Sequence, residues 1–181
     1  AIALLNSGNI NEALKVSNIA YNYRPSSPIV LYWRGFIFEM LGRYEDSLKV
    51  YDKLIVIDSE NPEVWNSRGN ILTDMGMLGE AIESFNKAVE VCLDDSEMDA
   101  AAINRMGNAY IDIGKLDDAL DCFNKAISLE KNNIDFLLNK GVVLMELGKF
   151  EEAVDSFNRV LLRSPDNEDA FFLKEECLEY L

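Results

Sequence analysis

Apolar residues recur at intervals of three and four along most of the chain, the spacing that places them on one face of an α-helix. Residues 64–75 and 134–147 show this pattern clearly. Such segments are followed by a glycine and, within about two residues, by a second amphipathic segment, as at residues 44–57, 116–129 and 150–163. Two helices joined by so short a turn pack as an antiparallel hairpin. The pattern therefore predicts an all-α protein built from helix pairs.

Two series of glycines repeat in phase with these helix pairs. In the first series Gly35 and Gly69 lie 34 residues apart, and so do Gly107 and Gly141. The second series follows the first after seven residues and consists of Gly42, Gly76, Gly114 and Gly148, with Gly8 ahead of them. A fixed period of this size is typical of a repeat array, in which stacked units share a core and function belongs to the surface of the stack.

Alignment on the glycines divides the chain into repeats. The four full repeats are residues 28–61, 62–95, 100–133 and 134–167. Ahead of them, residues 1–27 are the back part of a repeat whose beginning is missing, and behind them residues 168–181 form a capping helix. The insertion at residues 96–99 predicts a longer connection or an extended helix, in which Ser96 and Asp99 form a capping box.

The two glycine series predict different structural roles. Glycines of the second series follow an apolar helix and suit the left-handed residue that ends it. Glycines of the first series lie inside a helix, where each costs about 1 kcal/mol relative to alanine, so we expect that the helices need the space. Twelve residues later there is a small residue, namely Ser47, Ala81, Ala119 or Ala153. The next layer is aromatic and consists of Tyr51, Phe85, Phe123 and Phe157.

Several residues recur in phase in the pattern of a known family. In one repeat they are Trp65, Arg68, Gly69, Leu72, Gly76, Ala81, Phe85 and Ala88, and in the next Ile103, Met106, Gly107, Tyr110, Gly114, Ala119, Phe123 and Ala126. Over its whole length the chain resembles the tetratricopeptide repeat family, as about five repeats and a C-terminal capping helix in one domain, residues 1–181. The departures are Ser47 and Leu54 in place of two alanines, Ser17 in place of an aromatic residue, and Lys174-Glu175 in place of arginine and glycine.

The resemblance implies a right-handed superhelical solenoid of antiparallel helix pairs. Its inner groove, lined by the first helix of each pair, would bind a peptide or helical segment of a partner protein. The register of the family implies which residues line this groove. Those of the first full repeat are Ile29, Tyr32, Trp33, Phe36 and Met40. Those that follow are Asn66, Asn70, Asn104, Arg105, Asn108, Leu138, Asn139 and Val142.

The aromatic residues of this groove allow two interpretations. Tyr32, Trp33 and Phe36 form an unusually apolar wall, because the core of the hairpin does not need them. They could form a hydrophobic pocket for an anchor side chain, since aromatic clusters dominate binding energy at interfaces. Alternatively, the missing front of the first repeat, or an earlier repeat, covers Ile29 and Trp33. We favour the first interpretation, because exposed apolar patches are seldom without a partner.

The polar groove residues also allow two interpretations. Asn66 and Asn70 are four residues apart and share a helix face, as do Asn104 and Asn108. An amide both donates and accepts, so such pairs could hold the backbone of an extended peptide. Asparagine at these positions is, however, common in the family whatever the ligand. Arg105 could bind a ligand carboxylate or form a structural ion pair, for which the candidates are Asp74, Asp112 and Asp135.

Charge and composition narrow the class of partner. The formal net charge of −15 argues against nucleic acid, whose phosphates need lysine and arginine, and against anionic lipid. The negative charge favours a basic or neutral protein ligand. An apolar anchor side chain of this ligand would bind to the aromatic wall. The sequence contains no apolar run of the roughly 18–20 residues that a membrane span needs and no visible signal peptide. We therefore expect a cytoplasmic location, with the three scattered cysteines reduced.

The residues needed for catalysis are not apparent in this sequence. Histidine, the commonest general base and metal ligand, is absent, and the turn from Gly76 to Gly79 lacks the lysine of a phosphate-binding loop. We expect no enzyme activity, no metal and no cofactor. Two alternatives to a peptide-binding scaffold remain open. The array could be a docking or assembly arm of a larger, possibly catalytic polypeptide, or it could form a homo-oligomer through an open N-terminal end at Ile2, Leu5 and Leu31.

Overall fold

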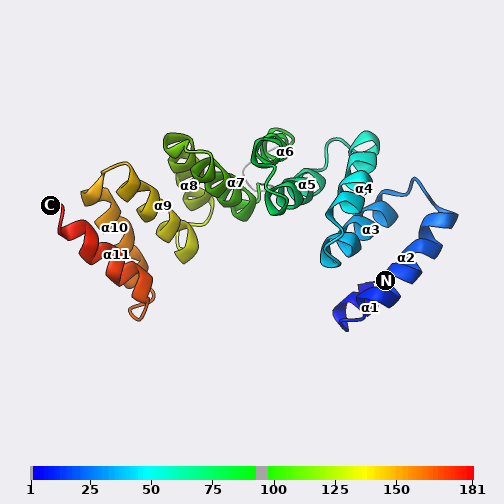
Figure 1. The fold of residues 1–181 in the computed structure, drawn as a ribbon, viewed down its shortest axis with the longest axis horizontal. Helices are drawn as coiled ribbons and strands as arrows, with labels where there is room; N and C mark the ends of the chain where they lie inside the picture. The colour runs from blue at the N-terminus through cyan, green and yellow to red at the C-terminus, as the bar shows by residue number, and fades with distance from the viewer. Residues whose placement is uncertain (1, 93–97) are drawn as a thin grey trace. The chain divides into compact units, whose positions relative to one another are not determined.

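The computed structural model describes residues 2–92 and 98–181, and every regular element in these two stretches is an α-helix (Figure 1). The prediction of an all-α protein is confirmed. The chain divides into two compact units, an N-terminal unit of residues 1–94 and a C-terminal unit of residues 95–181. The helices of the N-terminal unit are α1 (Ile2–Asn6), α2 (Ile10–Tyr23), α3 (Pro28–Met40), α4 (Tyr44–Ile57), α5 (Pro62–Asp74) and α6 (Leu78–Glu90). Those of the C-terminal unit are α7 (Ala100–Asp112), α8 (Leu116–Leu129), α9 (Ile134–Glu146), α10 (Phe150–Leu161) and α11 (Glu168–Leu178).

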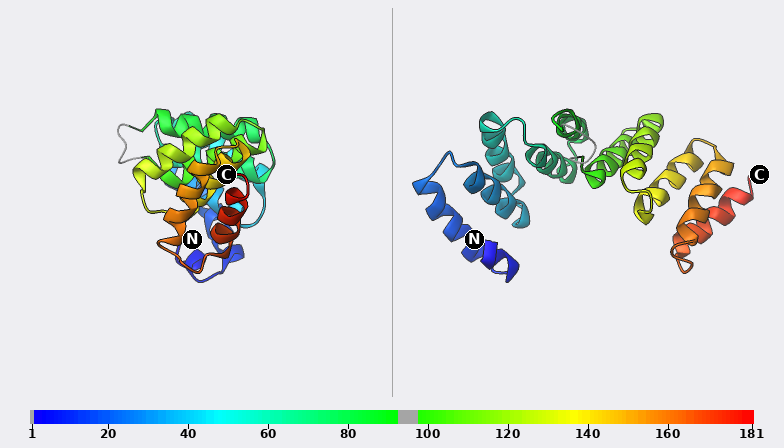
Figure 2. Two further views of the ribbon diagram at one scale, coloured as in Figure 1. Left: turned by 90° about the vertical axis from the view of Figure 1, so that its left-hand side faces the viewer. Right: turned by 180° about the vertical axis from the view of Figure 1, so that it is seen from behind.

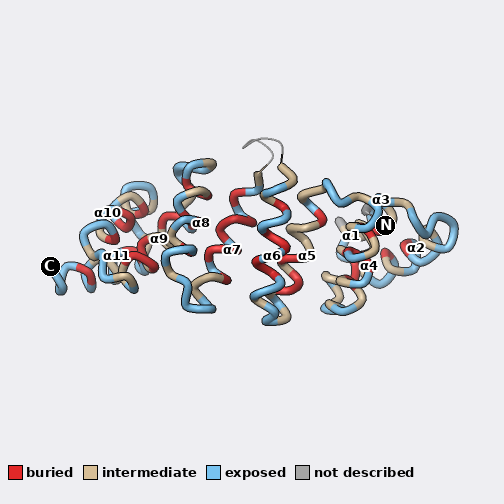
Figure 3. The backbone as a smooth tube through the Cα atoms, turned by 90° about the horizontal axis from the view of Figure 1, so that it is seen from above, coloured by how far each residue is buried: buried red, intermediate tan, exposed pale blue. Residues whose placement is uncertain are grey.

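The helices pack as antiparallel hairpins, each closed by a three-residue turn (Figure 1, Figure 2). In the N-terminal unit α3 packs on α4 and α5 on α6, and in the C-terminal unit α7 packs on α8 and α9 on α10. Neighbouring hairpins also pack on each other, because α2 contacts α3, α4 contacts α5 and α8 contacts α9. Buried and exposed positions alternate along the helices (Figure 3), so that each hairpin buries the apolar faces that the sequence pattern predicts.

Left-handed glycines end the first helix of each of these hairpins, as predicted. Gly42 follows α3 with a φ of 68°. Its N–H donates to the carbonyl oxygen of Glu39 at 2.8 Å, and the N–H of Arg43 donates to the carbonyl oxygen of Phe38 at 2.9 Å. These two bonds satisfy carbonyl groups that the end of the helix would otherwise leave without a donor. The same positive φ occurs at Gly8, Gly76, Gly114 and Gly148.

Two alanine substitutions at the α5–α6 turn test this backbone requirement. A Cβ added to either Gly76 or Gly79 has no atom within 4 Å, but only Gly76 has a positive φ, of 73°. We expect Gly76→Ala to lower the free energy of unfolding by about 1–2 kcal/mol, because the left-handed conformation is unfavourable for an L-residue with a side chain. Gly79→Ala, within α6, is expected to raise it by about 0.5–1 kcal/mol. Urea denaturation measures both changes, and a shift of the same sign in the two variants would contradict the explanation.

Asparagine and aspartate side chains begin several of the helices. Asn61 Oδ1 accepts a hydrogen bond from the N–H of Glu63 at 3.1 Å before α5. Asp99 Oδ1 accepts from the N–H groups of Ala101 and Ala102 at 2.9 and 3.2 Å, so α7 begins at Ala100. The prediction that Asp99 is the inner member of a capping box is therefore wrong: Asp99 has an extended conformation and is itself the cap. Ser96 lies outside the described residues.

The mid-helix glycines provide space for aromatic rings of the facing helix. A Cβ built on Gly107 would lie 2.6 Å from Cε1 of Phe123, and one built on Gly35 would lie 2.7 Å from Cε1 of Tyr51. Gly69 and Gly141 face Phe85 and Phe157 in the same way. All four rings are at most 1% exposed. The aromatic side chains therefore lie directly on the glycines, whereas the sequence analysis placed them in the next layer.

The backbones of paired helices also approach closely at the small residues that follow the glycines. Ser47 Oγ of α4 donates a hydrogen bond to the carbonyl oxygen of Gly35 in α3 at 2.7 Å. Its counterparts Ala81, Ala119 and Ala153 have no exposed surface. The serine that departs from the family pattern is thus accommodated, because its buried hydroxyl has an acceptor within the hairpin.

Candidate functional site

The N-terminal unit has an aromatic wall on α3, which consists of Ile29, Tyr32, Trp33 and Phe36. Trp33 packs edge to face against both Tyr32 and Phe36, with ring centroids 5.8 Å apart and ring planes at 88° in each pair. Tyr32 also contacts the buried ring of Tyr51, at 6.2 Å. Partial burial raises the pKa of Tyr32 above its ordinary value, so its phenol is neutral at physiological pH. Such edge-to-face contacts favour a defined orientation of the rings.

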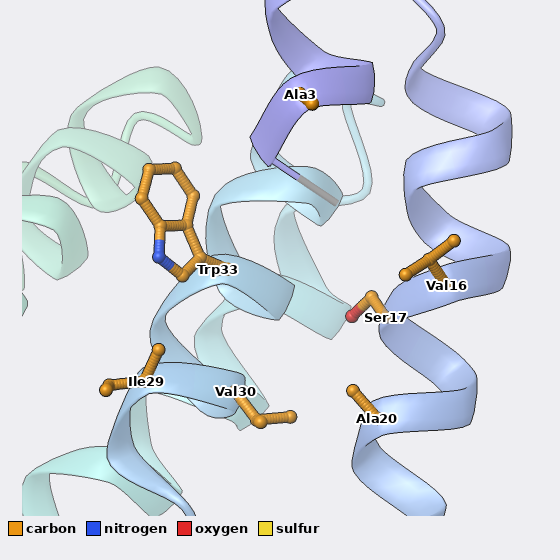
Figure 4. A pocket seen from close by; sticks show the side chains of 7 residues that line it. All are labelled: Ala3, Val16, Ser17, Ala20, Ile29, Val30 and Trp33. Atoms are coloured by element: carbon orange, nitrogen blue, oxygen red, sulfur yellow. The ribbon is translucent and has the colours of Figure 1, made fainter.

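Two clefts adjoin the aromatic wall, and Ile29 and Trp33 line both of them. The first, of about 340 Å³, lies between α1, α2 and α3 (Figure 4), and its other lining residues are Ala3, Val16, Ser17, Ala20 and Val30. The second, of about 360 Å³, involves α3, α4 and the start of α5, and its other lining residues are Pro28, Tyr32, Leu54, Asp58, Asn61 and Glu63. Ile29 is 72% exposed and Met40, the last residue of α3, is 49% exposed. The wall is therefore accessible from two sides within this unit.

Two asparagines of α5 have unused hydrogen-bonding capacity. Asn66 and Asn70 are half-buried, and the Oδ1 atom of each is buried without a hydrogen-bond partner among the described residues. A buried acceptor that lacks a donor costs about 1–3 kcal/mol. Because the two residues share a helix face, their amides form the pair that the sequence analysis expected, and the structure gives them no internal donor.

The C-terminal unit places its predicted groove residues in three different environments. Asn104 of α7 is buried and its Oδ1 accepts a hydrogen bond from Nδ2 of Asn139 in α9 at 3.0 Å, so one hydrogen bond joins the two amides. Arg105 and Asn108 are exposed on α7. The described residues of this unit include no carboxylate that forms an ion pair with Arg105, so the expected pairing with Asp112 or Asp135 is not made. The half-buried apolar residues are Leu138 and Val142, both on α9.

The last helix of this unit, α11, has two exposed aromatic side chains. Phe171 is 50% exposed and Phe172 is 66% exposed, and the two rings contact each other edge to face. Beyond the helix, Tyr180 stacks on Phe150 with ring centroids 4.7 Å apart. Helix α11 packs on α10, yet its outer face is not uniformly polar. The capping helix expected at residues 168–181 therefore has an exposed aromatic pair as well as polar residues.

Three family models match overlapping parts of the chain. Models of the tetratricopeptide repeat match residues 60–132 and 104–168, and a model of the TPR repeat matches residues 40–76. Together they extend from residue 40 to residue 168, across hairpins of both units. The chain belongs to the tetratricopeptide repeat family. The family resemblance inferred from the recurring glycine, alanine and aromatic positions is thereby confirmed.

Two curated relatives of this tetratricopeptide repeat chain match parts of it. Tetratricopeptide repeat protein 13 of Homo sapiens is 28% identical over 96 residues, which are 50% of this chain and 11% of that protein. Tetratricopeptide repeat protein 14 of Mus musculus is 36% identical over 58 residues, which are 32% of this chain and 8% of that protein. The matches thus cover about a tenth of the length of these relatives.

Solved tetratricopeptide repeat structures match most of the chain. MamA superposes with a TM-score of 0.83 at 20% identity, covering 90% of this chain and 93% of MamA. PilF of Pseudomonas aeruginosa has a TM-score of 0.84 at 19% identity and covers 98% of this chain and 79% of PilF. YrrB, described as a TPR protein with an unusual peptide-binding site, has a TM-score of 0.80 at 21% identity, over 91% of this chain and 82% of YrrB. At these identities the likeness shows the fold.

Helix α2 contributes to the cleft of this tetratricopeptide array, which the repeat register did not predict. The register places the groove on first helices, whereas Val16, Ser17 and Ala20 of the second helix α2 line the cleft beside Trp33. Ser17 was noted only as a departure from the aromatic pattern of the family. That departure was the available signal, because a small residue at a ring position leaves space in the packing.

Metal ligands, one buried thiol and helix length can each be assessed in the described part of the tetratricopeptide array. The described residues contain no group of three or more histidine, cysteine, aspartate or glutamate side chains that could hold a metal ion. Burial raises the pKa of the Cys122 thiol to about 12, with smaller contributions from Asp118 and Asp121, so a thiolate does not form there near neutral pH. Over residues 2–92 and 98–181, no helix has the length and apolar character that crossing a membrane demands. The distinctive groups are aromatic rings, apolar clefts and unpaired amides.

Proposed function

We propose that this array is a scaffold that binds a peptide or helical segment of a partner protein against the first helices of its hairpins. Membership of the tetratricopeptide repeat family supports a protein–protein interaction scaffold, and the structural neighbour YrrB is described as having a peptide-binding site. The observation that supports the location is the aromatic wall, where Trp33 packs on two neighbouring rings between two clefts. Aromatic side chains of this kind are frequent energetic centres of interfaces.

The charge of the protein supports a basic or neutral partner with an apolar anchor. The chain has a formal net charge of −15, which disfavours nucleic acid and anionic membrane surfaces as ligands. Asp58 and Glu63 lie beside Tyr32 and Trp33 in the second cleft. A ligand with a basic residue next to an apolar one would match this edge of the wall. Binding of this kind requires no catalytic residue, metal or cofactor.

The other predicted groove residues fall into two groups under this proposal. Asn66 and Asn70 are candidates for contact with a peptide backbone, because their buried carbonyl oxygens lack donors. Arg105 and Asn108 are exposed and remain candidates in the C-terminal unit. Asn104 is buried and its carbonyl oxygen accepts a hydrogen bond from Asn139, so less of its amide is available to a ligand than in the exposed residues. The Asn104–Asn139 pair therefore supports the packing of α7 on α9, and its loss would affect stability before binding.

We expect Trp33→Ala and Phe36→Ala each to weaken binding of the partner segment about 30-fold or more, the loss typical of an aromatic residue at the centre of an interface. Affinity capture with mass spectrometry would identify the partner, and isothermal titration with the isolated segment would give the dissociation constants. Both side chains are only half-buried, so the helical content and the cooperativity of melting should change little.

Tyr23→Ala is the matched control, because Tyr23 is an aromatic residue of the same unit that is 83% exposed and lies at the end of α2. Its removal should leave the affinity within about twofold, as expected for a side chain outside an interface. If Trp33→Ala and Phe36→Ala both unfold the N-terminal unit, the two rings belong to the core. The wall would then not be a binding surface.

Two other functions have specific observations in their favour. The chain spans about a tenth of the length of its curated relatives, which is consistent with a docking or assembly arm of a larger polypeptide. The apolar cleft beside α1 is consistent with self-association. Leu31, which was expected at this open end, is fully buried in the core and cannot contribute. Light scattering at several concentrations separates these alternatives, since only self-association makes the apparent mass rise with concentration.

A further inference from the structure

One hairpin of the N-terminal unit lacks the aromatic ring that the other hairpins share. Tyr51 and Phe85 are buried against mid-helix glycines in this unit, as Phe123 and Phe157 are in the other. Ser17 occupies the same position of the repeat, 34 residues before Tyr51. Its side chain is far smaller than a ring, so the place that aromatic residues fill elsewhere is not filled by α2.

The space at this position is the apolar cleft of about 340 Å³ between α1, α2 and α3. Figure 4 shows Ser17 and Ala20 of α2 facing Val30 of α3, with Trp33 at one side. Apart from the Ser17 hydroxyl and the indole nitrogen of Trp33, the side chains drawn there end in carbon. An apolar cavity of about 150 Å³ is enough to bind benzene. The cleft is therefore large enough for an aromatic ring.

The hydroxyl of Ser17 is a buried polar group without a partner. Ser17 is only 4% exposed, and its Oγ has no hydrogen bond within the described residues. The other buried serines are satisfied: Ser47 donates to the carbonyl oxygen of Gly35, Ser84 to that of Glu80 and Ser156 to that of Glu152. Buried polar groups without a partner are rare in folded proteins. In Figure 4 this hydroxyl points from α2 into the space in front of α3.

We propose that the cleft between α1, α2 and α3 binds a tyrosine side chain of the partner segment, with the phenol hydroxyl hydrogen-bonded to Ser17 Oγ. The ring enters the packing at the repeat position of Ser17, where the other hairpins have Tyr51, Phe85, Phe123 and Phe157. The proposal rests on the proposed scaffold function, for which it specifies the anchor. A phenol matches the cleft because its hydroxyl is the one polar group of an otherwise apolar ring. This hydroxyl would meet the Ser17 hydroxyl, a polar group in an otherwise apolar lining. Trp33 adds an aromatic neighbour for the bound ring.

The test uses p-cresol as the side-chain analogue of tyrosine and toluene as that of phenylalanine. Each compound is titrated into the protein, and binding is followed by NMR through the amides of Ser17 and Ala20 and the indole N–H of Trp33. We expect both compounds to bind the wild-type chain, with p-cresol binding roughly threefold to tenfold more tightly because of one neutral hydrogen bond. Ser17→Ala should bind toluene as before and lose the preference for p-cresol.

Two variants fill the cleft from different positions. Ser17→Phe supplies the missing ring from α2 itself and should abolish binding of both compounds. Ala20→Leu fills the same cleft from the next turn and keeps the test valid if Ser17→Phe does not fold. Ser128→Ala removes a hydroxyl from an exposed position of α8 and should leave both affinities unchanged.

The outcomes separate this inference from the function on which it rests. If p-cresol does not shift the amides of Ser17 and Ala20, or binds no better than toluene, the tyrosine assignment is wrong. If the full-length protein fails to bind p-cresol while this chain binds it, the protein's own segment covers the cleft, and the assignment is overturned as well. Partner binding that survives Ser17→Phe but is lost in Phe36→Ala would retain the scaffold function and reject only the tyrosine anchor.

Discussion

Gly107→Ala is expected to lower the free energy of unfolding of the C-terminal unit, and the same substitution is expected to raise it when Phe123 is alanine as well. In the native hairpin, a Cβ on Gly107 would lie 2.6 Å from Cε1 of Phe123. The ring has no exposed surface and cannot move aside without displacing its neighbours. Overpacking of this kind costs about 1–3 kcal/mol, whereas alanine gains about 1 kcal/mol over glycine within a helix. The net loss should therefore be up to about 2 kcal/mol.

Phe123→Ala by itself should cost about 3–5 kcal/mol, the usual loss for a fully buried phenylalanine. In that background the ring no longer opposes a Cβ at position 107. The helix propensity of alanine then acts without the clash, and the second substitution should stabilise the unit by up to about 1 kcal/mol. The helix-propensity gain is common to both backgrounds, so the coupling energy between the two positions should equal the overpacking cost, about 1–3 kcal/mol.

Denaturant unfolding of the wild type, the two single variants and the double variant measures this cycle. Far-UV circular dichroism reports the helices, and the slope with denaturant shows whether each variant still unfolds as one unit. Additive effects of the two substitutions would show that Gly107 is not needed to make space for the Phe123 ring. In that case the recurring glycines would need another explanation, such as backbone contact alone.

Ala153→Leu is expected to have the second large effect, a loss of about 1–3 kcal/mol or more in the free energy of unfolding. Ala153 lies in α10 and has no exposed surface. Its counterpart Ser47 places a side-chain oxygen 2.7 Å from a backbone oxygen of the facing helix, which shows how little space this position of the hairpin offers. A leucine side chain would force α9 and α10 apart, or it would have to adopt an unfavourable rotamer.

The matched control for this substitution is Asp155→Leu. Asp155 is on the exposed side of the same helix, so leucine there meets solvent and should change stability by less than about 0.5 kcal/mol. Thermal and urea unfolding of the two variants should differ clearly. A neutral Ala153→Leu would mean that the hairpin can widen, and the small residue at this position would not be a packing requirement.

The helix pairs could be predicted in detail because their signals are local. The limits of α4 and α8 agree with those expected from the apolar period, and the positive φ values occur at the second glycine series. Helix α10 ends at Leu161, two residues earlier than expected, and helix ends are the least certain feature of a periodic pattern. Helix caps and left-handed glycines depend only on residues that are close together in the sequence, so they can be predicted directly from it.

The candidate site was predictable only in part. The register of the repeats placed Tyr32, Trp33 and Phe36 on one helix, where Trp33 contacts the adjacent residue Tyr32 and, one turn later, Phe36. The pairing of Asn104 with Asn139 depends on how α7 and α9 pack, which the sequence does not state. Likewise, the Oδ1 atoms of Asn66 and Asn70 can be recognised as lacking a hydrogen-bond donor only once the positions of the surrounding donors are known.

By itself the sequence determined the family, the helix hairpins and the positions that need glycine, because each of these depends on periodicity and on backbone conformation. The tertiary structure decided what surrounds each side chain. It showed that the glycines face aromatic rings, that one asparagine pair is internal, and that Ser17 lies buried and unpartnered beside an apolar cleft. These facts depend on distances between helices that are far apart in the chain, and such distances are fixed by packing rather than by local sequence.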